Sequence, residues 1–488
     1  MKNLKRLLFL LLAGTSLASV PACTDGFEEL NVNPNQNPNV LPETLLAPAL
    51  TDLVKRNMDR AHRITNELMQ VHVARVDGDE FHRYVIRPAE ADFLWNGWYT
   101  QLTDFRDMYA SAAATQSSTF MGIARICEVW TFSLLTDTFG DVPYAEALQG
   151  RAGLLQPKFD RQEDIYRDLF AKLEEANELL KTNVNLTASQ AQLDPIYQGN
   201  ALQWRKFGNS LYLRLLLRVS QRTDAVARGL SPQAKLRELV NTNAADYPLI
   251  ASNAESAILR WTGTAPYQSP FQTWRTADFS SFNSMGEFFI NNLVEWNDPR
   301  LGKWATLSNG TYEGIPSGYP ATQIPAAKST YPAALMTEPL LGNMLNYPEV
   351  QLLLAEAALR GWISGDAKTF YETGATNGIT LWGLAVPPGF LTNADVKWEP
   401  GSNFDTKLDQ IHLQKYYALF FTDFQQWFEY RRTGHPVLPL GPGLQNNRQM
   451  PARINYPLYV QSLNQVNYQA AVADQGPDNV NTKVWWQQ

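Results

Sequence analysis

Residues 347–379 read YPEVQLLLAEAALRGWISGDAKTFYETGATNGI, and this stretch contains two helical patterns separated by a short turn. The first pattern runs from Tyr347 to Arg360 and is rich in leucine and alanine, which favour helices. Gly361 follows at once, and glycine is common just past a helix end because it adopts the left-handed conformation without steric cost. A second helix is predicted near Ala367 to Ile379. The stretch therefore predicts two helices joined by a tight turn.

A pair of helices with a short turn and small residues at the crossing resembles a tetratricopeptide unit. Helical periodicity also dominates from about Glu43 to Arg222. Within it, residues 160–180 have one apolar helical face, and Asp160 with Glu163 is predicted to form a capping box. Residues 202–220 predict another long helix. The expected fold class is all-α, with tetratricopeptide-like helix pairs forming a scaffold and with long irregular, loop-rich insertions; the irregular spacing argues against an uninterrupted solenoid.

Two sets of side chains on predicted helices are given structural roles. On the helix at 202–220, an i, i+4 row is expected to face solvent or buried acids: Arg214, Arg218 and Arg222. A last helix is predicted from about Lys407 to Arg431, and its helically spaced aromatic stripe is expected in the core: Tyr417, Phe420, Phe424, Trp427 and Phe428. Neither set is predicted to bind a ligand.

The character of the chain changes between about residues 241 and 347, where Gly, Pro, Ser, Thr and Asn become frequent. Only short helical patterns occur there, such as Asn283 to Val294. A long irregular segment inside a compact protein is usually functional. Residues 43–488 are therefore predicted to form a single helical domain with a loop-rich region at about 241–347.

The first residues predict export. Three basic residues precede a short apolar run from Leu7 to Ala18, which is the layout of a secretory signal and is too short to span a membrane comfortably. Residues 20–23 read Val-Pro-Ala-Cys, a small-residue box before a cysteine. Residues 1–22 are therefore predicted to be a lipoprotein signal peptide, with Cys23 as the lipidation site. An ordinary secretory cleavage nearby is the alternative. The Asn- and Pro-rich residues 23–42 are predicted to be a lipid-attached tether.

Charge and cysteine content restrict the partners and the chemistry. The formal net charge is −7, and removing residues 1–22 removes three positive charges and leaves −10. An acidic surface excludes nucleic acid as the expected partner, because phosphate binding needs a basic surface.

The sequence has two cysteines, so lipidation of Cys23 leaves Cys127 without a disulfide partner. Cys127 lies in an apolar stretch and is expected to be an inert core residue.

The sequence contains no motif that predicts a catalytic residue, a cofactor or a metal ion. The five histidines form no zinc-binding helix pattern, and no nucleophile elbow, phosphate-binding loop or dinucleotide fingerprint is present. The acidic residues 77–80 lack the full spacing of a calcium loop. Forty-eight acidic residues leave a glycosidase-like carboxylate pair open as the main enzymatic alternative.

Two groups of residues are predicted to contact a ligand, because aromatic rings beside polar side chains suit sugar rings and hydroxyls. The first group lies in the stretch between two early helices: Arg83, Tyr84 and Trp95. The second lies in the loop-rich region: Trp274, Asp278, Phe279, Phe282 and Asn283. Trp98 and Tyr99 fall in the next predicted helix and are expected in the core. The same residue types also suit a peptide ligand.

Several motifs, in their shared order, resemble the SusD/RagB family of outer-membrane lipoproteins, in particular its SusD-like branch. They cover nearly the whole chain: residues 23–35, 135–144 and 157–173, the helix at 204–215, Asp298–Leu301, Ala355–Ala357, Gln414–Tyr416, Arg431–Pro436 and Pro451–Arg453. Physically these motifs look structural, since Gly140 and Pro143 mark a turn and Asp298 can pair with Arg300. We assign no ligand contact to them.

The resemblance implies a non-enzymatic, lipid-anchored protein exposed on the cell surface at the outer membrane. Such a protein captures an oligosaccharide or peptide and passes it to a SusC-like TonB-dependent transporter. Two alternatives remain open at this point. One is a surface adhesin or structural protein without a role in import, and the other is a glycoside hydrolase.

Overall fold

The computed structural model describes residues 40–75, 80–280 and 282–488. Residues 41–488 form one compact unit. The predicted signal peptide, Cys23, nearly all of the predicted tether and most of the acidic stretch 77–80 lie outside the described residues. The predictions made for them therefore stay predictions.

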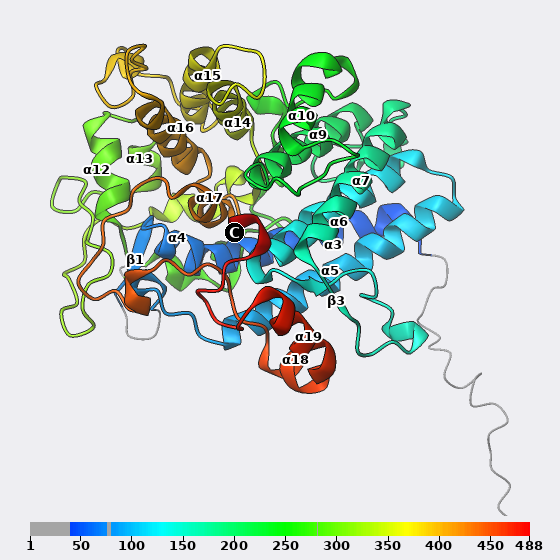
Figure 1. Ribbon diagram of the computed structural model, residues 1–488. Coiled ribbons are helices and arrows are strands. Elements are labelled where there is room, and N and C mark those ends of the chain that lie inside the picture. The colour runs from blue at the N-terminus through cyan, green and yellow to red at the C-terminus, as the bar shows by residue number, and fades with distance from the viewer. Residues whose placement is uncertain (1–39, 76–79, 281) are drawn as a thin grey trace, which may run out of the picture. The chain divides into compact units, whose positions relative to one another are not determined.

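The described chain consists mainly of helices packed in sequence order (Figure 1). The helices of the first half are α3 (Pro42–Arg63), α4 (Thr65–Leu68), α5 (Ala89–Ala114), α6 (Ser118–Phe139), α7 (Gln162–Lys181), α8 (Ala188–Ala191), α9 (Ala201–Arg218) and α10 (Pro232–Arg237). Helix α3 packs on α5, α5 on α6, α6 on α7, and α7 on α9. The prediction of an all-α scaffold built from neighbouring helix pairs is confirmed.

The second half continues the scaffold after an irregular region. Its helices are α11 (Pro270–Thr273), α12 (Glu287–Glu295), α13 (Leu301–Trp304), α14 (Tyr347–Leu359), α15 (Ala367–Thr380), α16 (Phe404–Ala418), α17 (Gln425–Thr433), α18 (Leu458–Leu463) and α19 (Gln465–Gln475). Helix α14 packs on both α15 and α16 (Figure 1). Gly361 has a φ of 71°, and Gly374 lies where a Cβ atom would come within 2.7 Å of Leu352. The predicted turn and the predicted small residue at the helix crossing are both present.

Short segments complete the framework. The described residues contain three antiparallel pairs of strands: β1 (His72–Ala74) with β5 (Asn283–Met285), β2 (Val142–Pro143) with β3 (Phe159–Asp160), and β4 (Ala257–Ile258) with β6 (Asn343–Leu345). Single-turn 3-10 and π segments are η1 (Phe81–Arg83), η2 (Gly150–Ala152), η3 (Glu238–Thr242), η4 (Ala244–Asp246), η5 (Asn253–Glu255), η6 (Thr276–Phe279), η7 (Ala333–Thr337), η8 (Pro339–Gly342), η9 (Phe390–Thr392), η10 (Asn446–Arg448) and η11 (Trp485–Gln487). The predicted helix at 283–294 is therefore wrong at its start, where β5 pairs with β1 before α12 begins.

The predicted capping box at Asp160 is wrong. Asp160 lies in β3, and its Oδ2 accepts hydrogen bonds from the backbone N–H groups of Tyr144 and Ala145. The N–H of Gln162, the first residue of α7, instead donates to Oδ1 of Asp141 at 2.8 Å. The cap of α7 thus comes from the preceding turn, 21 residues earlier in the chain.

The predicted helix at 407–431 is in fact two helices. Helix α16 ends at Ala418 and α17 begins at Gln425, and between them Phe421 and Asp423 have φ values of 58° and 35°. Residues with positive φ cannot continue a right-handed helix. The aromatic stripe is nevertheless buried throughout, as predicted.

The arginine row of α9 pairs with acids, as expected. The Arg214 guanidinium makes two hydrogen bonds to Glu349, at 2.6 and 2.7 Å. Arg218 lies 3.1 Å from Asp137, and both pairs are buried. Arg222, at the end of the row, pairs with Asp224 at 2.6 Å near the surface.

Candidate ligand-binding surface

Exposed aromatic side chains are rare in the part of the chain that the structure describes. Only three occur there: Trp274 at 58% exposure, Phe282 at 54% and Phe404 at 43%. Trp274 and Phe282 lie eight residues apart on one loop, whereas Phe404 begins α16. The loop at 274–282 therefore concentrates exposed aromatic surface, and it is the second group that the sequence predicted.

Local hydrogen bonds fix the start of this loop. Ser269 caps α11 by accepting from the N–H of Phe271, and Pro270 provides the fixed φ of the first helical position. The N–H of Trp274 donates to the carbonyl of Pro270 and ends the short helix. Trp274 is thereby placed at a helix end, where its ring projects to solvent.

Phe279 anchors the middle of the same loop. Its ring lies 4.7 Å from the ring of Phe271 and 4.9 Å from that of Tyr331, and the side chain is 6% exposed. Beyond it, the Asn283 side chain donates to the carbonyl of Asp278 at 2.8 Å. The loop thus buries the ring of Phe279 and leaves the rings of Trp274 and Phe282, on either side of it in sequence, exposed.

Charged groups lie between the two exposed rings in sequence. Arg275 donates two hydrogen bonds to the Asp278 carboxylate, each at 2.8 Å, and its Nε also lies 3.0 Å from Asp59 of α3. Burial raises the pKa of Asp59, against the opposing influence of Arg60 and Arg275. The sequence prediction included Asp278 but missed Arg275 and Asp59. The i, i+3 spacing of Arg275 and Asp278 was the available indication.

Four of the eight predicted ligand contacts are buried and do not lie on the surface as expected: Arg83, Tyr84, Trp95 and Phe279. Tyr84 is 3% exposed and Arg83 is 8% exposed, and the Arg83 guanidinium lies 3.3 Å from Glu80. Phe279 packs in the core, as described above. Burial of these side chains follows from tertiary packing of η1 and η6, which the residue types alone do not reveal.

Trp95 lies inside α5 and not between two helices, which corrects its predicted position. Its ring is 6% exposed and packs against Phe139 and Tyr456. The same ring lines an apolar pocket of about 290 Å³ together with Tyr99, Leu155, Tyr459 and Leu463, among others. Trp98 is buried as predicted, but Tyr99 is only half-buried and reaches this pocket.

The polar atoms around this pocket are already paired. The Tyr99 hydroxyl donates to the carbonyl of Pro143, the Tyr459 hydroxyl to Asn96, and the Asn464 amide to the carbonyl of Pro157. The pocket therefore offers apolar contact and few hydrogen bonds. Its lining suits an apolar ligand better than the hydroxyl-rich surface of a sugar.

A larger cavity of about 670 Å³ lies between α5, α6 and α7, and its lining is charged. Arg106, Arg125 and Lys172 converge on the buried carboxylate of Glu128, at 3.2, 2.9 and 3.3 Å. Burial raises the pKa of Glu128, but these cations, Lys172 foremost, bring it below the ordinary value. Arg125 also pairs with Glu175 at 2.8 Å and Lys172 with Asp168 at 2.9 Å, so three carboxylates match the three cations and the cluster stabilises the packing of three helices.

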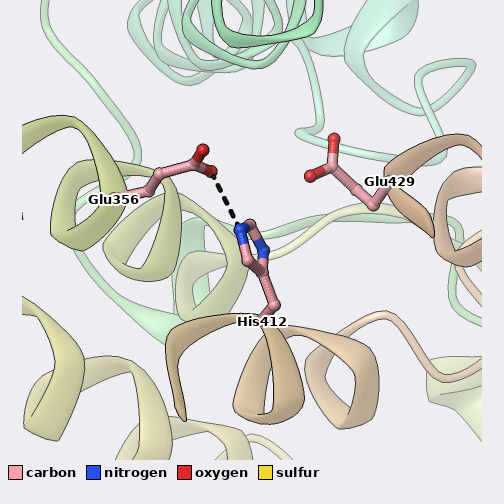
Figure 2. A group of neighbouring side chains, drawn as sticks. All are labelled: Glu356, His412 and Glu429. Carbon is pink, nitrogen blue, oxygen red and sulfur yellow. Dashed lines mark ion pairs between the residues drawn. The ribbon is translucent and has the colours of Figure 1, made fainter. Parts of the chain in front are cut away.

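One buried group has the composition of a metal site. Glu356 of α14, His412 of α16 and Glu429 of α17 converge in Figure 2, with ligand atoms within 4.8 Å of one another. Arg432 lies 2.6 Å from Glu356 and 2.7 Å from Glu429, and Lys415 lies 2.6 Å from Glu429. These two cations already balance the two carboxylates, and a divalent ion would sit beside both of them. The residues present therefore fit an ion-pair network and not a metal site.

Cys127 lies in the core, as the sequence suggested. Cys127 is fully buried in α6, and burial raises the pKa of its thiol well above the ordinary value. An inert core thiol is confirmed. None of the helices in the described part of the chain is both long enough and apolar enough to cross a membrane.

Comparison with known proteins identifies similar sequences and folds. The model of the SusD-like family described as "Starch-binding associating with outer membrane" matches residues 34–457. No curated protein has a matching sequence.

Solved structures of SusD homologues share the fold. One from Bacteroides fragilis is 24% identical, with 92% of this chain and 99% of that chain covered and a TM-score of 0.77. One from Bacteroides uniformis is 24% identical, with 91% and 99% covered and a TM-score of 0.77. A chitin-binding homologue from Flavobacterium johnsoniae is 21% identical, with 92% and 98% covered and a TM-score of 0.78.

Proposed function

The chain belongs to the SusD-like family of starch-binding proteins associated with the outer membrane, and from this premise we propose that it captures glycans at the cell surface for import. In this proposal Cys23 carries the lipid that anchors the protein. The bound oligosaccharide passes to a SusC-like TonB-dependent transporter in the same membrane. The protein binds its ligand and does not cleave it.

The exposed aromatic loop is the observation that supports glycan binding most directly. Trp274 and Phe282 present ring faces to solvent, and such faces pack on the apolar faces of sugar rings. Arg275, Asp278 and Asn283 lie on the same loop and supply hydrogen-bonding groups. A loop with exposed rings beside a few polar groups suits carbohydrate recognition.

The charged groups near this loop favour binding over hydrolysis. Asp59 is buried and the Asp278 side chain is only 13% exposed, so neither carboxylate is accessible to a substrate as a general acid or a nucleophile. The carboxylates of Glu356 and Glu429 are buried in their ion-pair network. These pairings support the non-enzymatic proposal.

Calorimetric titration of the soluble chain from residue 24 tests glycan binding. Chitooligosaccharides and maltooligosaccharides are the first probes, because one structural relative binds chitin and the family description names starch. Heat of binding that saturates with either series supports the proposal. Binding of unmodified peptides with no response to any glycan would replace the glycan with a peptide as the nutrient.

Membrane fractionation and co-purification test the anchor and the transporter. We expect the full-length protein in the outer-membrane fraction, and a Cys23→Ala variant outside it, because acyl chains supply the membrane affinity. A TonB-dependent barrel that co-purifies with the wild-type protein in mild detergent supports delivery. Glycan binding without such a barrel would favour a surface adhesin.

A further inference from the structure

The charged residues on the same exposed loop indicate which glycans it accepts. Resting on the proposed function, we infer that the surface at Trp274–Asn283 takes neutral oligosaccharides and rejects anionic ones such as uronate-containing glycans. The reason is that its guanidinium groups are already neutralised by carboxylates of the protein itself. The inference concerns the charge of the ligand, which neither the fold nor the aromatic rings specify.

Arg275 is the cation closest in sequence to the exposed rings, and the fork formed by its Nε and Nη2 donors is occupied by Asp278. Both of its hydrogen bonds to Asp278 are 2.8 Å long, and Asp59 approaches its Nε at 3.0 Å. A guanidinium recognises a ligand carboxylate best through two parallel hydrogen bonds. Here Asp278 already occupies that position, so an incoming uronate meets a carboxylate instead of an open guanidinium.

Arg60 of α3 is also paired with carboxylates of the protein. Nη1 of Arg60 donates to Glu90 at 2.9 Å, and its Nε lies 3.6 Å from Asp59. The flat face of its guanidinium lies 3.7 Å from the ring centroid of Phe93. The Arg60 side chain is 15% exposed and is paired with carboxylates of the protein, so little of its guanidinium is accessible to an anionic ligand.

The charges of the whole cluster cancel. Arg63 also lies within electrostatic reach of Asp59, so three arginines face the three carboxylates of Asp59, Asp278 and Glu90. His62, beside Asp278, adds no charge at neutral pH because burial lowers its pKa to about 3. A neutral cluster provides no attraction for an anion.

The charge of the rest of the protein acts in the same direction. Charged residues in 1–39 cancel, so the remainder of the chain keeps the formal net charge of −7. Such a body repels a polyanion within about one Debye length, roughly 8 Å at physiological ionic strength. Neutral oligosaccharides experience no such repulsion.

Binding measurements with neutral and anionic probes test the inference on the chain from residue 24. We expect chitooligosaccharides or maltooligosaccharides to bind with an affinity that changes little with salt. We expect oligogalacturonides of equal length to bind at least tenfold more weakly. An oligogalacturonide that binds as tightly as the neutral probes, and loses affinity in Trp274→Ala, would overturn the inference while glycan capture itself would stand.

A gain of binding provides the sharper test, because it does not depend on the natural ligand being among the probes. Asp278→Asn removes the carboxylate that occupies the Arg275 fork. We expect it to increase oligogalacturonide affinity about threefold to fivefold, in line with the strength of a partly exposed ion pair.

The matched control is Asp164→Asn on α7, which removes the same charge beside the exposed Arg167; Asp164 lies 2.6 Å from this guanidinium, which stays bonded to Glu163 at 2.8 Å. We expect no gain from this control. An equal gain in both variants would show that only net charge matters, and no gain in Asp278→Asn would show that the Arg275 pair does not set selectivity. Either result overturns the inference. Thermal unfolding of both variants confirms that they are folded.

Discussion

Trp274 and Phe279 lie five residues apart on one loop and have opposite surroundings. Trp274 is 58% exposed, whereas Phe279 is 6% exposed among Phe271 and Tyr331. We expect Trp274→Ala to weaken binding of a neutral oligosaccharide at least fivefold, since a ring stacked on a sugar contributes more than about 1 kcal/mol. Calorimetric titration measures this loss, and the thermal midpoint should stay nearly unchanged.

Phe404→Ala is the matched control for that prediction, because Phe404 is the third exposed aromatic residue and lies on α16. It should leave oligosaccharide affinity unchanged. Equal losses in both variants would mean that exposed aromatic area, and not this loop, determines binding.

Phe279→Ala tests the anchoring role of the buried ring. Truncation of a buried phenylalanine leaves a cavity and typically costs about 3–5 kcal/mol of unfolding free energy. We expect a loss in that range in urea unfolding, together with weaker glycan binding because the loop loses its fixed position. A variant with wild-type stability but no glycan binding would instead make Phe279 a direct ligand contact.

The sequence predicted the composition of this loop but not the direction of its side chains. Trp274, Phe279 and Phe282 have similar chemistry, and only the packing of Phe279 against residues distant in sequence separates them. Arg83 and Tyr84 illustrate the same limit, because their burial depends on contacts that a local pattern does not contain. Residue types identify a candidate segment, while tertiary contacts determine which members face solvent.

At the scale of elements, the sequence located helices well and their ends poorly. Apolar periodicity continues from Lys407 to Arg431, so it gives no indication of the break between α16 and α17. The break requires positive φ at Phe421 and Asp423, neither of which is a glycine. The cap of α7 was misassigned for a related reason, because Asp141 from the preceding turn takes the place that Asp160 was expected to fill.

Asp423, in the break between α16 and α17, makes the stability of the fold depend on pH. Its Oδ2 accepts from the Trp130 indole of α6 at 3.2 Å, and burial raises the pKa of Asp423 to about 6, against the opposing influence of Arg214. A folded-state pKa above the unfolded value of about 4 means that this group contributes stability below pH 4 and loses it as the pH rises through 6. The loss is about 2–3 kcal/mol, by 1.36 kcal/mol per pKa unit.

Asp423→Asn removes this titration. We expect the difference in thermal midpoint, variant minus wild type, to increase as the pH rises from 4.5 to 7.5. The asparagine amide facing Trp130 adds a cost that does not depend on pH, so the change with pH is the relevant quantity. A difference that is constant across this range would contradict a raised pKa for Asp423.

At the scale of the whole molecule, buried ion pairs connect helices from both halves of the chain. Glu429 of α17 lies 3.4 Å from Arg218 of α9, and Arg432 of α17 lies 2.6 Å from Glu356 of α14. The sequence predicted acid partners for the α9 arginines but could not name them, because Glu429 is more than 200 residues from Arg218. The helix pairs were predictable from periodicity, whereas the network that joins them required the structure.

This network leads to a prediction that separates an ion-pair network from a metal site. Glu356→Gln leaves Arg432 and Lys415 with one fewer carboxylate in a buried position, and breaking a buried pair typically costs about 3–5 kcal/mol. We expect a loss of that size in urea unfolding, with no dependence on chelator or added zinc in either protein.

The control is Glu163→Gln, which removes an exposed i, i+4 pair with Arg167 and should cost less than about 1 kcal/mol. If chelator lowers the thermal midpoint of the wild type but not of Glu356→Gln, the cluster binds a metal ion and the charge balance we derive for it is incorrect.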